Sequence, residues 1–207
     1  MEPVTPEDPR IRLLISFVSR VKDRASSGAY SDVNRRRLVE VLERLESKLQ
    51  ELRYSYLPPD QVAEKLSALR SELEEAANPE EPDLRWLLEY LERADRLFGR
   101  EVRDEADAVL CTVCEVLSVR EHPEADNLRV TTVEAGDFGR RTVVTNLEDV
   151  EEGDLMALAL LPPREFMGVV SEGMFCGRAD GDPGEIIEPP DRGEVRSAVM
   201  EWLEGSE

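Results

Sequence analysis

Lysine, asparagine, glutamine and histidine are scarce in this chain of 207 residues. Three lysines stand beside twenty-three arginines, asparagine and glutamine together number six, and His122 is the single histidine. Few amides are typical of heat-adapted proteins, and an excess of carboxylates keeps a protein soluble in concentrated salt. We therefore interpret the formal net charge of −20 as a sign of a thermophilic or salt-accumulating source. It does not by itself exclude nucleic acid as a partner.

Long apolar runs are also missing. No stretch reaches the ~18 apolar residues of a membrane helix, and the opening MEPVTPEDPR is acidic and interrupted by proline, unlike a secretory signal. We expect a soluble, cytoplasmic protein that has no membrane partner.

The single histidine and three cysteines limit the catalytic and metal-binding sites that the chain can form. With one histidine and no partner for it, no catalytic constellation is visible, so we expect a protein that is not an enzyme. Cys111 and Cys114 form a C-x-x-C and Cys176 stands alone. Residues three apart in a strand face opposite sides, so we interpret the cysteines as small buried side chains. No metal and no cofactor is predicted.

Residues 1–106 have the period of helices, with apolar side chains every three or four positions. Short connections between the four expected helices make neighbours antiparallel, so we predict an antiparallel helical bundle. Ser31 or Asp32 is expected to cap the second helix. The seams are too short for a long coiled coil, although pairing between chains in a homodimer stays open. The seams consist of Ile11–Val21, Leu38–Leu52, Val62–Leu73 and Leu84–Phe98.

The period changes to two near Asp104–Asp107, where a strand-rich region begins. Five short strands fit a small β-barrel of the OB type, and a last helix is expected from Glu194. The predicted class is α+β, with a helical bundle over 1–106, an OB-fold over 107–190 and a C-terminal helix over 191–207. The strands are expected near Val109–Val119, Leu128–Val133, Arg140–Thr145, Leu155–Leu161 and Val169–Cys176, and an extra strand at 185–187.

Two motifs stand in the strand-rich region. The first is His-Pro-x-Ala-Asp-x-Leu over 122–128, and the second is Gly-x-x-Ser-x-Gly-Met over 168–174. In this order they resemble the tRNA-binding OB-fold module of methionyl-tRNA synthetases, phenylalanyl-tRNA synthetase β subunits and the polypeptide related to endothelial monocyte activation. The chain also resembles archaeal predicted RNA-binding proteins that carry this module at the C-terminus. The resemblance covers 108–180 and implies binding of tRNA or another structured RNA, with a short helix over Asn146–Gly153.

The resemblance and the residue chemistry together give a predicted RNA-binding set. His122 either contacts a base or braces its loop, Asp126 and Asn127 shape a turn, and Ser171 and Glu172 offer polar contacts. Gly173 either admits a ligand or forms a bulge, and Met174 either contacts RNA or lies in the core. The full set is His122, Pro123, Asp126, Asn127, Arg120, Arg129, Arg140, Arg141, Arg164, Ser171, Glu172, Gly173 and Met174.

The sequence departs from the family in its basic residues. The lysines that usually precede the second motif are absent, which leaves Arg164, and Asn127 replaces a common lysine. Residues 108–180 hold six arginines against fourteen acids. Each lost phosphate contact weakens the electrostatic part of RNA affinity.

The helical region holds the strongest basic cluster of the chain. Its members are either a solvated helix face or a second contact for RNA or for an aminoacyl-tRNA synthetase. The alternative function is therefore an assembly or scaffold protein that docks a synthetase or dimerises, with a degenerate RNA site. The basic residues are Arg10, Arg12, Arg20, Lys22, Arg24, Arg35, Arg36 and Arg37.

Overall fold

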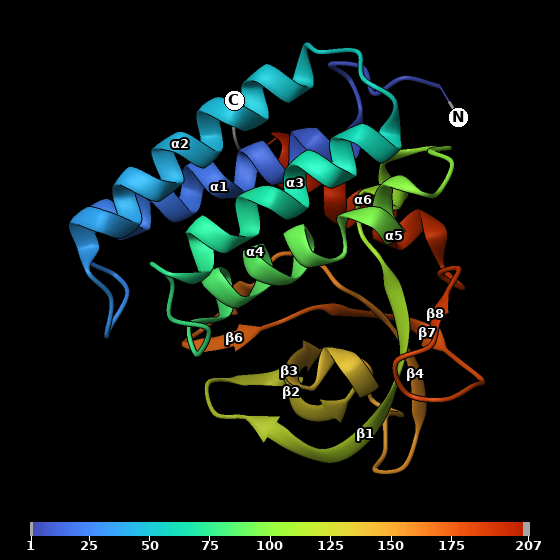
Figure 1. Ribbon diagram of the computed structural model, residues 1–207. Coiled ribbons are helices and arrows are strands. Elements are labelled where there is room, and N and C mark those ends of the chain that lie inside the picture. Colours follow the sequence, from blue (N-terminus) through green and yellow to red (C-terminus); the bar gives the residue numbers. More distant parts are fainter. Residues whose placement is uncertain (1, 205–207) are drawn as a thin grey trace. The chain divides into compact units, whose positions relative to one another are not determined.

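The computed structural model describes residues 2–204 (Figure 1). By their internal contacts the residues form two compact units. One runs to Ala108 and takes up the chain again from Val199, and the other is Val109–Ala198. We call them the helical unit and the sheet unit. The predicted α+β class is confirmed, since helices precede an antiparallel sheet and a helix follows it. No helix of the described residues is long and apolar enough to cross a membrane.

The helices begin and end at residues suited to those places. The Asp8 side chain accepts a hydrogen bond from the Arg10 amide at the start of the first helix, and Gly28, with φ of 80°, ends it. The second helix is capped by Asn34, so the expected cap at Ser31 or Asp32 is wrong. Asp32 has φ of 54° and lies in the bend before the cap. The helices are α1 (Pro9–Ser27), α2 (Arg35–Arg53), α3 (Pro59–Glu74), α4 (Pro82–Glu92), α5 (Ala94–Phe98) and α6 (Arg192–Glu204).

The leucine seams form the core of the helical unit. In Figure 1, α1 packs along α2, and α3 packs against α4 and α5. Phe17 meets the ring of Trp86 edge-on at 4.8 Å and that of Trp202, at the end of α6, at 5.6 Å. Each buried leucine or phenylalanine stabilises the fold by roughly 1.5–3 kcal/mol. The residues that are wholly buried include Leu14, Leu38, Leu42, Leu49, Leu66, Leu73, Leu84 and Leu87.

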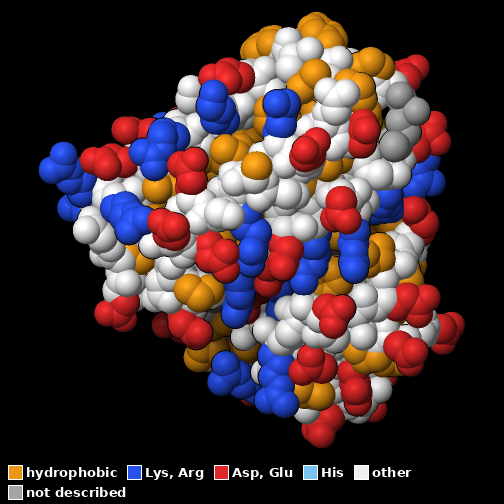
Figure 2. Space-filling view, viewed as in Figure 1, with side chains coloured by type: hydrophobic (Ala, Val, Ile, Leu, Met, Phe, Trp, Pro, Cys, Tyr) orange, Lys and Arg blue, Asp and Glu red, His pale blue; other side chains and the backbone are white. Residues whose placement is uncertain are grey.

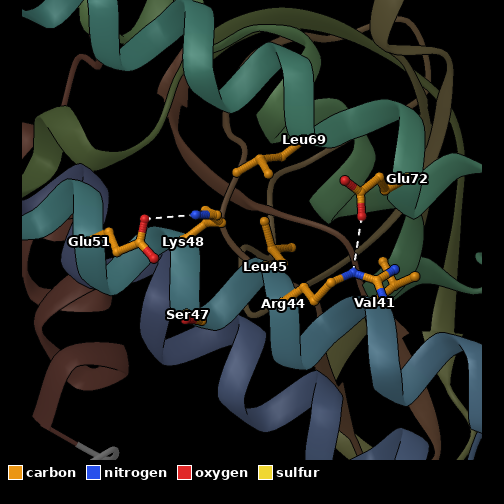
Figure 3. A pocket seen from close by; sticks show the side chains of 8 residues that line it. All are labelled: Val41, Arg44, Leu45, Ser47, Lys48, Glu51, Leu69 and Glu72. Atoms are coloured by element: carbon orange, nitrogen blue, oxygen red, sulfur yellow. Dashed lines mark hydrogen bonds and ion pairs between the residues drawn. The ribbon is translucent and has the colours of Figure 1, made fainter.

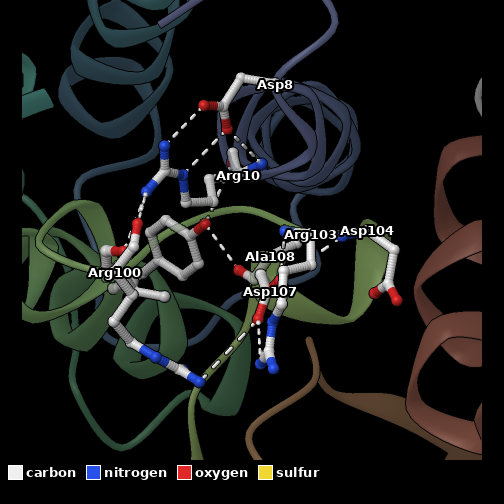
Figure 4. A network of polar contacts seen from close by, with 9 residues as sticks. Asp8, Arg10, Arg100, Arg103, Asp104, Asp107 and Ala108 are labelled. Carbon is white, nitrogen blue, oxygen red and sulfur yellow. Dashed lines mark hydrogen bonds and ion pairs between the residues drawn. The ribbon is translucent and has the colours of Figure 1, made fainter. Parts of the chain in front are cut away.

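A buried polar network joins the start of α1 to the end of α5 (Figure 4). The Arg10 guanidinium bonds the Asp8 carboxylate through two nitrogens, at 2.7 and 3.0 Å. Its third nitrogen donates to the carbonyls of Leu97 and Arg100, at 3.0 and 3.2 Å, and it lies 4.3 Å over the Phe98 ring. The guanidinium of Arg10 is therefore paired with Asp8 inside the helical unit.

The segment that follows α5 is held by a second buried carboxylate. Asp107, which lies in the short 3₁₀ turn η1 (Glu105–Ala108), accepts the Arg103 amide hydrogen at 2.8 Å. Its carboxylate lies 3.6 Å from the Arg103 guanidinium and 3.9 Å from that of Arg100. The Tyr90 hydroxyl reaches the Ala108 carbonyl at 2.8 Å, and burial raises the pKa of Tyr90 above its usual value. The last residues of the helical unit are thus fixed by its own side chains.

The sheet unit is built on one long, strongly bonded strand. β1 pairs antiparallel with β2 on one side, with β4 on the other and with β8 near its start. The strand order is β3-β2-β1-β4-β7, and β5 and β6 form a separate hairpin. The extra strand predicted near 185–187 is confirmed. The strands are β1 (Cys111–His122), β2 (Ala125–Glu134), β3 (Arg140–Thr145), β4 (Leu155–Ala159), β5 (Arg164–Phe166), β6 (Val169–Ser171), β7 (Met174–Arg178) and β8 (Ile186–Ile187).

Two details of the predicted barrel are wrong. The five-strand path stays open between β3 and β7. The single strand expected over Val169–Cys176 is divided into β6 and β7 at Glu172 and Gly173, and Gly173 has φ of 151°. No helix forms at Asn146–Gly153, since the β3–β4 connection is a loop with short turns. That segment holds too few residues for a stable helix.

Candidate nucleic-acid interface

The first motif forms the tight end of the β1–β2 hairpin. His122 pairs with Ala125, which leaves Pro123 and Glu124 as a two-residue turn. Asp126 and Asn127 belong to β2, so the turn expected at these two residues is wrong. Proline suits the first central position of such a turn because its φ is already fixed. Pro123, Asp126 and Asn127 are all exposed.

His122 braces this hairpin. Its side chain is 5% exposed, and its Nδ1 accepts the Glu124 amide hydrogen at 3.1 Å. The other ring nitrogen, Nε2, must then carry the proton, and it donates to the Phe166 carbonyl at 2.9 Å. Because both nitrogens are engaged, the imidazole joins the β1–β2 turn to strand β5. Of the two interpretations of His122, the structure supports bracing.

The β5–β6 hairpin lies at the other end of this hydrogen bond. Arg164 pairs with Ser171 and Phe166 with Val169, around a turn of Met167 and Gly168. Both turn residues have positive φ, of 45° and 84°, as in the type I′ turn that matches the twist of a hairpin. The bracing by His122 thus brings the two sequence motifs together. In OB-folds the loops between strands one and two and between strands four and five are the ones that bind oligonucleotides.

Ser171 and Glu172 form hydrogen bonds to β3 at the open edge of the sheet. Ser171 Oγ accepts the Val144 amide hydrogen and donates to the Gly173 carbonyl, each at 2.9 Å. Glu172 donates its amide hydrogen to the Thr142 carbonyl at 2.8 Å, and its carboxylate accepts the Thr142 amide hydrogen at 3.2 Å. The two residues are 3% and 6% exposed. Their polar atoms therefore form hydrogen bonds to β3. The sequence predicts contacts to RNA for these two residues.

Removing the Ser171 hydroxyl is expected to loosen this edge. Ser171→Ala leaves the buried Val144 amide without its acceptor, which costs about 1–3 kcal/mol. Hydrogen exchange followed by mass spectrometry should show faster exchange in the peptide that contains β3. Ser118→Ala, at an exposed position of β1, is the matched control and should leave exchange unchanged. Equal protection of β3 in both variants would contradict the assignment.

Gly173 and Met174 have structural surroundings. A Cβ atom at Gly173 would lie 2.8 Å from the Ala159 carbonyl oxygen and 2.8 Å from Leu158 Cδ1. Strand β4 thus leaves no room for a side chain, which accounts for the glycine without a ligand. Met174 is half-buried and pairs with Ala159.

The six arginines of the sheet unit up to Arg178 differ in what they contact. Arg120 is exposed and Arg129 half-buried, and among residues 2–204 neither has an acidic partner. Arg164 is exposed, with its guanidinium 5.7 Å over the Phe166 ring. Arg140 pairs with Glu134 at 3.3 Å. In Figure 2 the blue side chains low in the view gather over β1 and β2.

Arg141 does not belong to this surface. It is 3% exposed, because the register of β3 turns it inward opposite Val133, and it donates to the Phe138 carbonyl at 3.0 Å. The expectation that Arg141 contacts RNA is therefore wrong. Of the six arginines up to Arg178, Arg120, Arg140, Arg164 and Arg178 are exposed and Arg129 is half-buried. Arg178 is paired with Asp154 at 2.8 Å.

Most cations of the helical cluster are paired within the helical unit. Arg12 lies near Glu7, Lys22 by Glu46, Arg24 by Asp83, Arg36 by Glu40 and Arg37 by Glu75, while Arg20 lies over the Trp202 ring. Arg10 is buried and paired with Asp8, so its expected role as an RNA or partner contact is wrong. Arg35 is exposed and has no acidic partner in the described part of the chain. The cluster therefore offers less charge to an RNA than its sequence suggests.

The helical unit also contains a groove between α2 and α3 (Figure 3). Its volume is about 180 Å³, and Leu45 and Leu69 form part of its lining. Its cations are already paired, Arg44 with Glu72 at 3.2 Å and Lys48 with Glu51 at 2.8 Å. The groove is therefore a poor site for an anion such as phosphate.

The cysteines lie in the core of the sheet unit. The Sγ atoms of Cys111 and Cys176 are 3.5 Å apart, and all three thiols are free and buried. Burial raises the pKa of the Cys114 thiol to about 12. The thiol is therefore neutral and unreactive at physiological pH. Among the described residues no group of three or more His, Cys, Asp or Glu is arranged to hold a metal ion.

A comparison with known protein families finds a match over the sheet unit. Residues 111–197 match the family model described as "Putative tRNA binding domain". The match covers 87 of the 207 residues, so it describes this segment and not the chain as a whole. The matched residues include both hairpins and the two residues, Ser171 and Glu172, that hydrogen-bond to β3. The helical residues before β1 lie outside the match.

Curated relatives are similar over the same share of the chain. The cytoplasmic tyrosine–tRNA ligase of Gallus gallus is 33% identical over 104 residues, which are 46% of this chain and 19% of the ligase. The aminoacyl tRNA synthase complex-interacting multifunctional protein 1 of Mus musculus is 31% identical over 81 residues, 36% of this chain and 26% of that protein. The chain thus spans about a fifth to a quarter of these two relatives. Among solved structures, a MetRS related protein from Pyrococcus horikoshii is 23% identical, with a TM-score of 0.37, over 43% of this chain and all of that chain.

Two residues near the site were not predicted from the sequence. Phe166 supplies the carbonyl that His122 holds, and Met167 forms the exposed tip of the hairpin. The signal was the dipeptide Met167-Gly168 between two short β-rich runs, where a glycine often marks a hairpin turn.

Proposed function

We propose that the protein binds tRNA, without catalysis, through the end of the sheet unit where the β1–β2 turn and the β5–β6 hairpin meet. The observation that carries the proposal is the hydrogen bond from His122 to the Phe166 carbonyl, which joins the two family motifs at one place. Arg120, Arg129 and Arg164 supply positive charge to the phosphate backbone. The match of residues 111–197 to the tRNA-binding domain family supports tRNA as the ligand.

The geometry favours recognition of shape over sequence. The polar side chains of the second motif are buried, so few groups are left to read base edges. Folded RNA is commonly recognised by backbone geometry and by bases in loops. A handful of arginines gives a shallow salt dependence, with about two to three phosphate contacts. The pairing of the helical cations favours the sheet unit over the helical unit as the RNA site.

A titration of the full chain with folded tRNA tests the proposal. Arg164→Ala should weaken binding about fivefold, because one phosphate contact is lost. The matched control is Arg178→Ala, an exposed arginine of the same unit already paired with Asp154, and it should bind as the wild type does. If the wild-type chain does not bind tRNA at low salt, the proposed function is wrong. If the two variants bind equally well, the site is wrong.

A second function is supported by a different observation. Two of the three exposed large hydrophobic side chains of the described residues are Tyr54 and Tyr56, which lie between α2 and α3. Tyrosine is enriched where proteins dock onto one another, so the helical unit is a candidate contact for a protein partner such as an aminoacyl-tRNA synthetase or a second copy of the chain. Light scattering and pull-down after nuclease treatment test this function. Loss of every partner on nuclease treatment, together with a monomeric mass, would contradict it.

A further inference from the structure

The tip of the β5–β6 hairpin carries a side chain that its backbone does not favour. Met167 occupies the first central position of the turn with φ of 45°. Positive φ at both central positions is usually met by Asn-Gly, Asp-Gly or Gly-Gly. An unbranched apolar residue there is disfavoured by its own Cβ atom. Asparagine at position 167 would therefore stabilise the hairpin turn more than methionine does.

The Met167 side chain is also placed in solvent. It is 59% exposed. Among residues 2–204 the exposed large hydrophobic side chains are Met167, Tyr54 and Tyr56, and only Met167 belongs to the sheet unit. A single exposed apolar residue needs no explanation by itself. Tyr56 of the helical unit also combines 59% exposure with a positive φ, of 52°. Within the sheet unit, Met167 alone among the described residues combines a large exposed apolar side chain with such a backbone conformation, at the hairpin where the two motifs meet.

The hairpin holds this tip on a fixed base. The Phe166 carbonyl, one residue before Met167, accepts the His122 Nε2 hydrogen at 2.9 Å. At the other end of β6, Ser171 Oγ bonds the Val144 amide at 2.9 Å. The tip thus projects from a hairpin joined to both β1 and β3. A contact made by Met167 would lose little conformational entropy of the backbone.

The charges beside the tip suit RNA. The Arg164 guanidinium lies over the Phe166 ring on the same hairpin, so a cation and an aromatic ring stand next to the apolar tip. A thioether is polarisable and packs well against a flat π-system. An unstacked base with its phosphate matches this combination, since it offers a π-face and a negative charge together.

We propose that Met167 packs against an unstacked base of the bound RNA and makes the protein prefer folded RNA with exposed loop bases over plain duplex. This inference rests on the proposed tRNA binding and adds the residue that selects among RNAs. The contact requires no particular base, because every base has a π-face. Arg164 holds the adjoining phosphate.

The test compares Met167→Asn with Met167→Leu in the full chain. Each variant is titrated with folded tRNA and with a blunt RNA duplex of equal phosphate number. We expect Met167→Asn to bind tRNA about fivefold more weakly and the duplex unchanged, because an apolar contact is lost and no charge is altered. Met167→Leu keeps an apolar tip and should retain tRNA affinity. The thermal midpoint of Met167→Asn should equal or exceed that of the wild type, since asparagine suits the turn.

The outcomes separate this inference from the proposed function. If the wild type binds tRNA and Met167→Asn binds it equally well, the inference is wrong while the proposed function stands. If Met167→Asn weakens tRNA and duplex binding alike, or lowers the thermal midpoint, Met167 acts through the fold and the inference is wrong. If the wild-type chain binds no tRNA at low salt, both proposals are wrong.

Discussion

Arg10→Ala is expected to lower the free energy of unfolding of the helical unit by about 3–5 kcal/mol, because it leaves the buried Asp8 carboxylate unpaired. Asp8 and Arg10 are 8% and 3% exposed. The variant also loses the hydrogen bonds to the Leu97 and Arg100 carbonyls, which fix the end of α5. Urea unfolding followed by tryptophan fluorescence measures the loss, since Trp86 and Trp202 both lie in the helical unit.

The matched control for this prediction is Arg12→Ala, two residues further along α1. Arg12 lies 3.7 Å from Glu7, whose side chain is 78% exposed, and an exposed ion pair of this kind contributes at most about 1 kcal/mol. A loss below about 1 kcal/mol for Arg10→Ala, or equal losses in the two variants, would mean that the network in Figure 4 does not stabilise the unit as described.

Replacing Arg120, Arg129 and Arg164 together with alanine is expected to weaken tRNA binding on the order of 100-fold at about 0.1 M salt. Each arginine that contacts a phosphate releases about one counterion, and three such contacts give this magnitude. Fluorescence anisotropy with labelled tRNA measures the change. The three side chains are exposed or half-buried, so their removal should leave the thermal midpoint nearly unchanged.

The control is a triple variant of the helical unit that has the same change in net charge. Arg35, Arg36 and Arg37 are all exposed, and their replacement by alanine changes the net charge by the same amount. Arg36 and Arg37 are already paired with Glu40 and Glu75. We expect this variant to bind tRNA within about twofold of the wild type. A loss as large as that of the sheet-unit variant would place the RNA contact in the helical cluster.

Much of the fold could be predicted because periodicity reports burial directly. The seam through Leu38, Leu42, Leu45 and Leu49 predicted α2, and all four side chains are buried. The start of α2 could not be predicted as well, since Ser31, Asp32 and Asn34 are all good caps and their choice depends on the bend at Asp32. The division of the expected strand at Gly173 could not be predicted, because only the tertiary structure reveals the position of Gly173 against Ala159.

The candidate site could be predicted only in part. The motifs mark segments of the two hairpins, but the β5–β6 hairpin itself was not predicted, and Ser171, Glu172 and Arg141 are buried. A motif shows which residues a family shares, and a residue that holds two strands together is shared for the same reason as one that touches a ligand. Met167 was missed because its significance lies in a positive φ and a large exposure. Neither property can be seen in the sequence.

The central claim is that arginines of the sheet unit carry the contact to RNA. Its most direct test is the salt dependence of tRNA affinity for the full chain and the two triple variants. We predict that log K falls with log salt with a slope of about −2 to −3 in the wild type and in the Arg35, Arg36, Arg37 variant, and that the slope approaches zero in the Arg120, Arg129, Arg164 variant. An unchanged slope in the latter, or a loss of slope in the helical variant, would contradict the account.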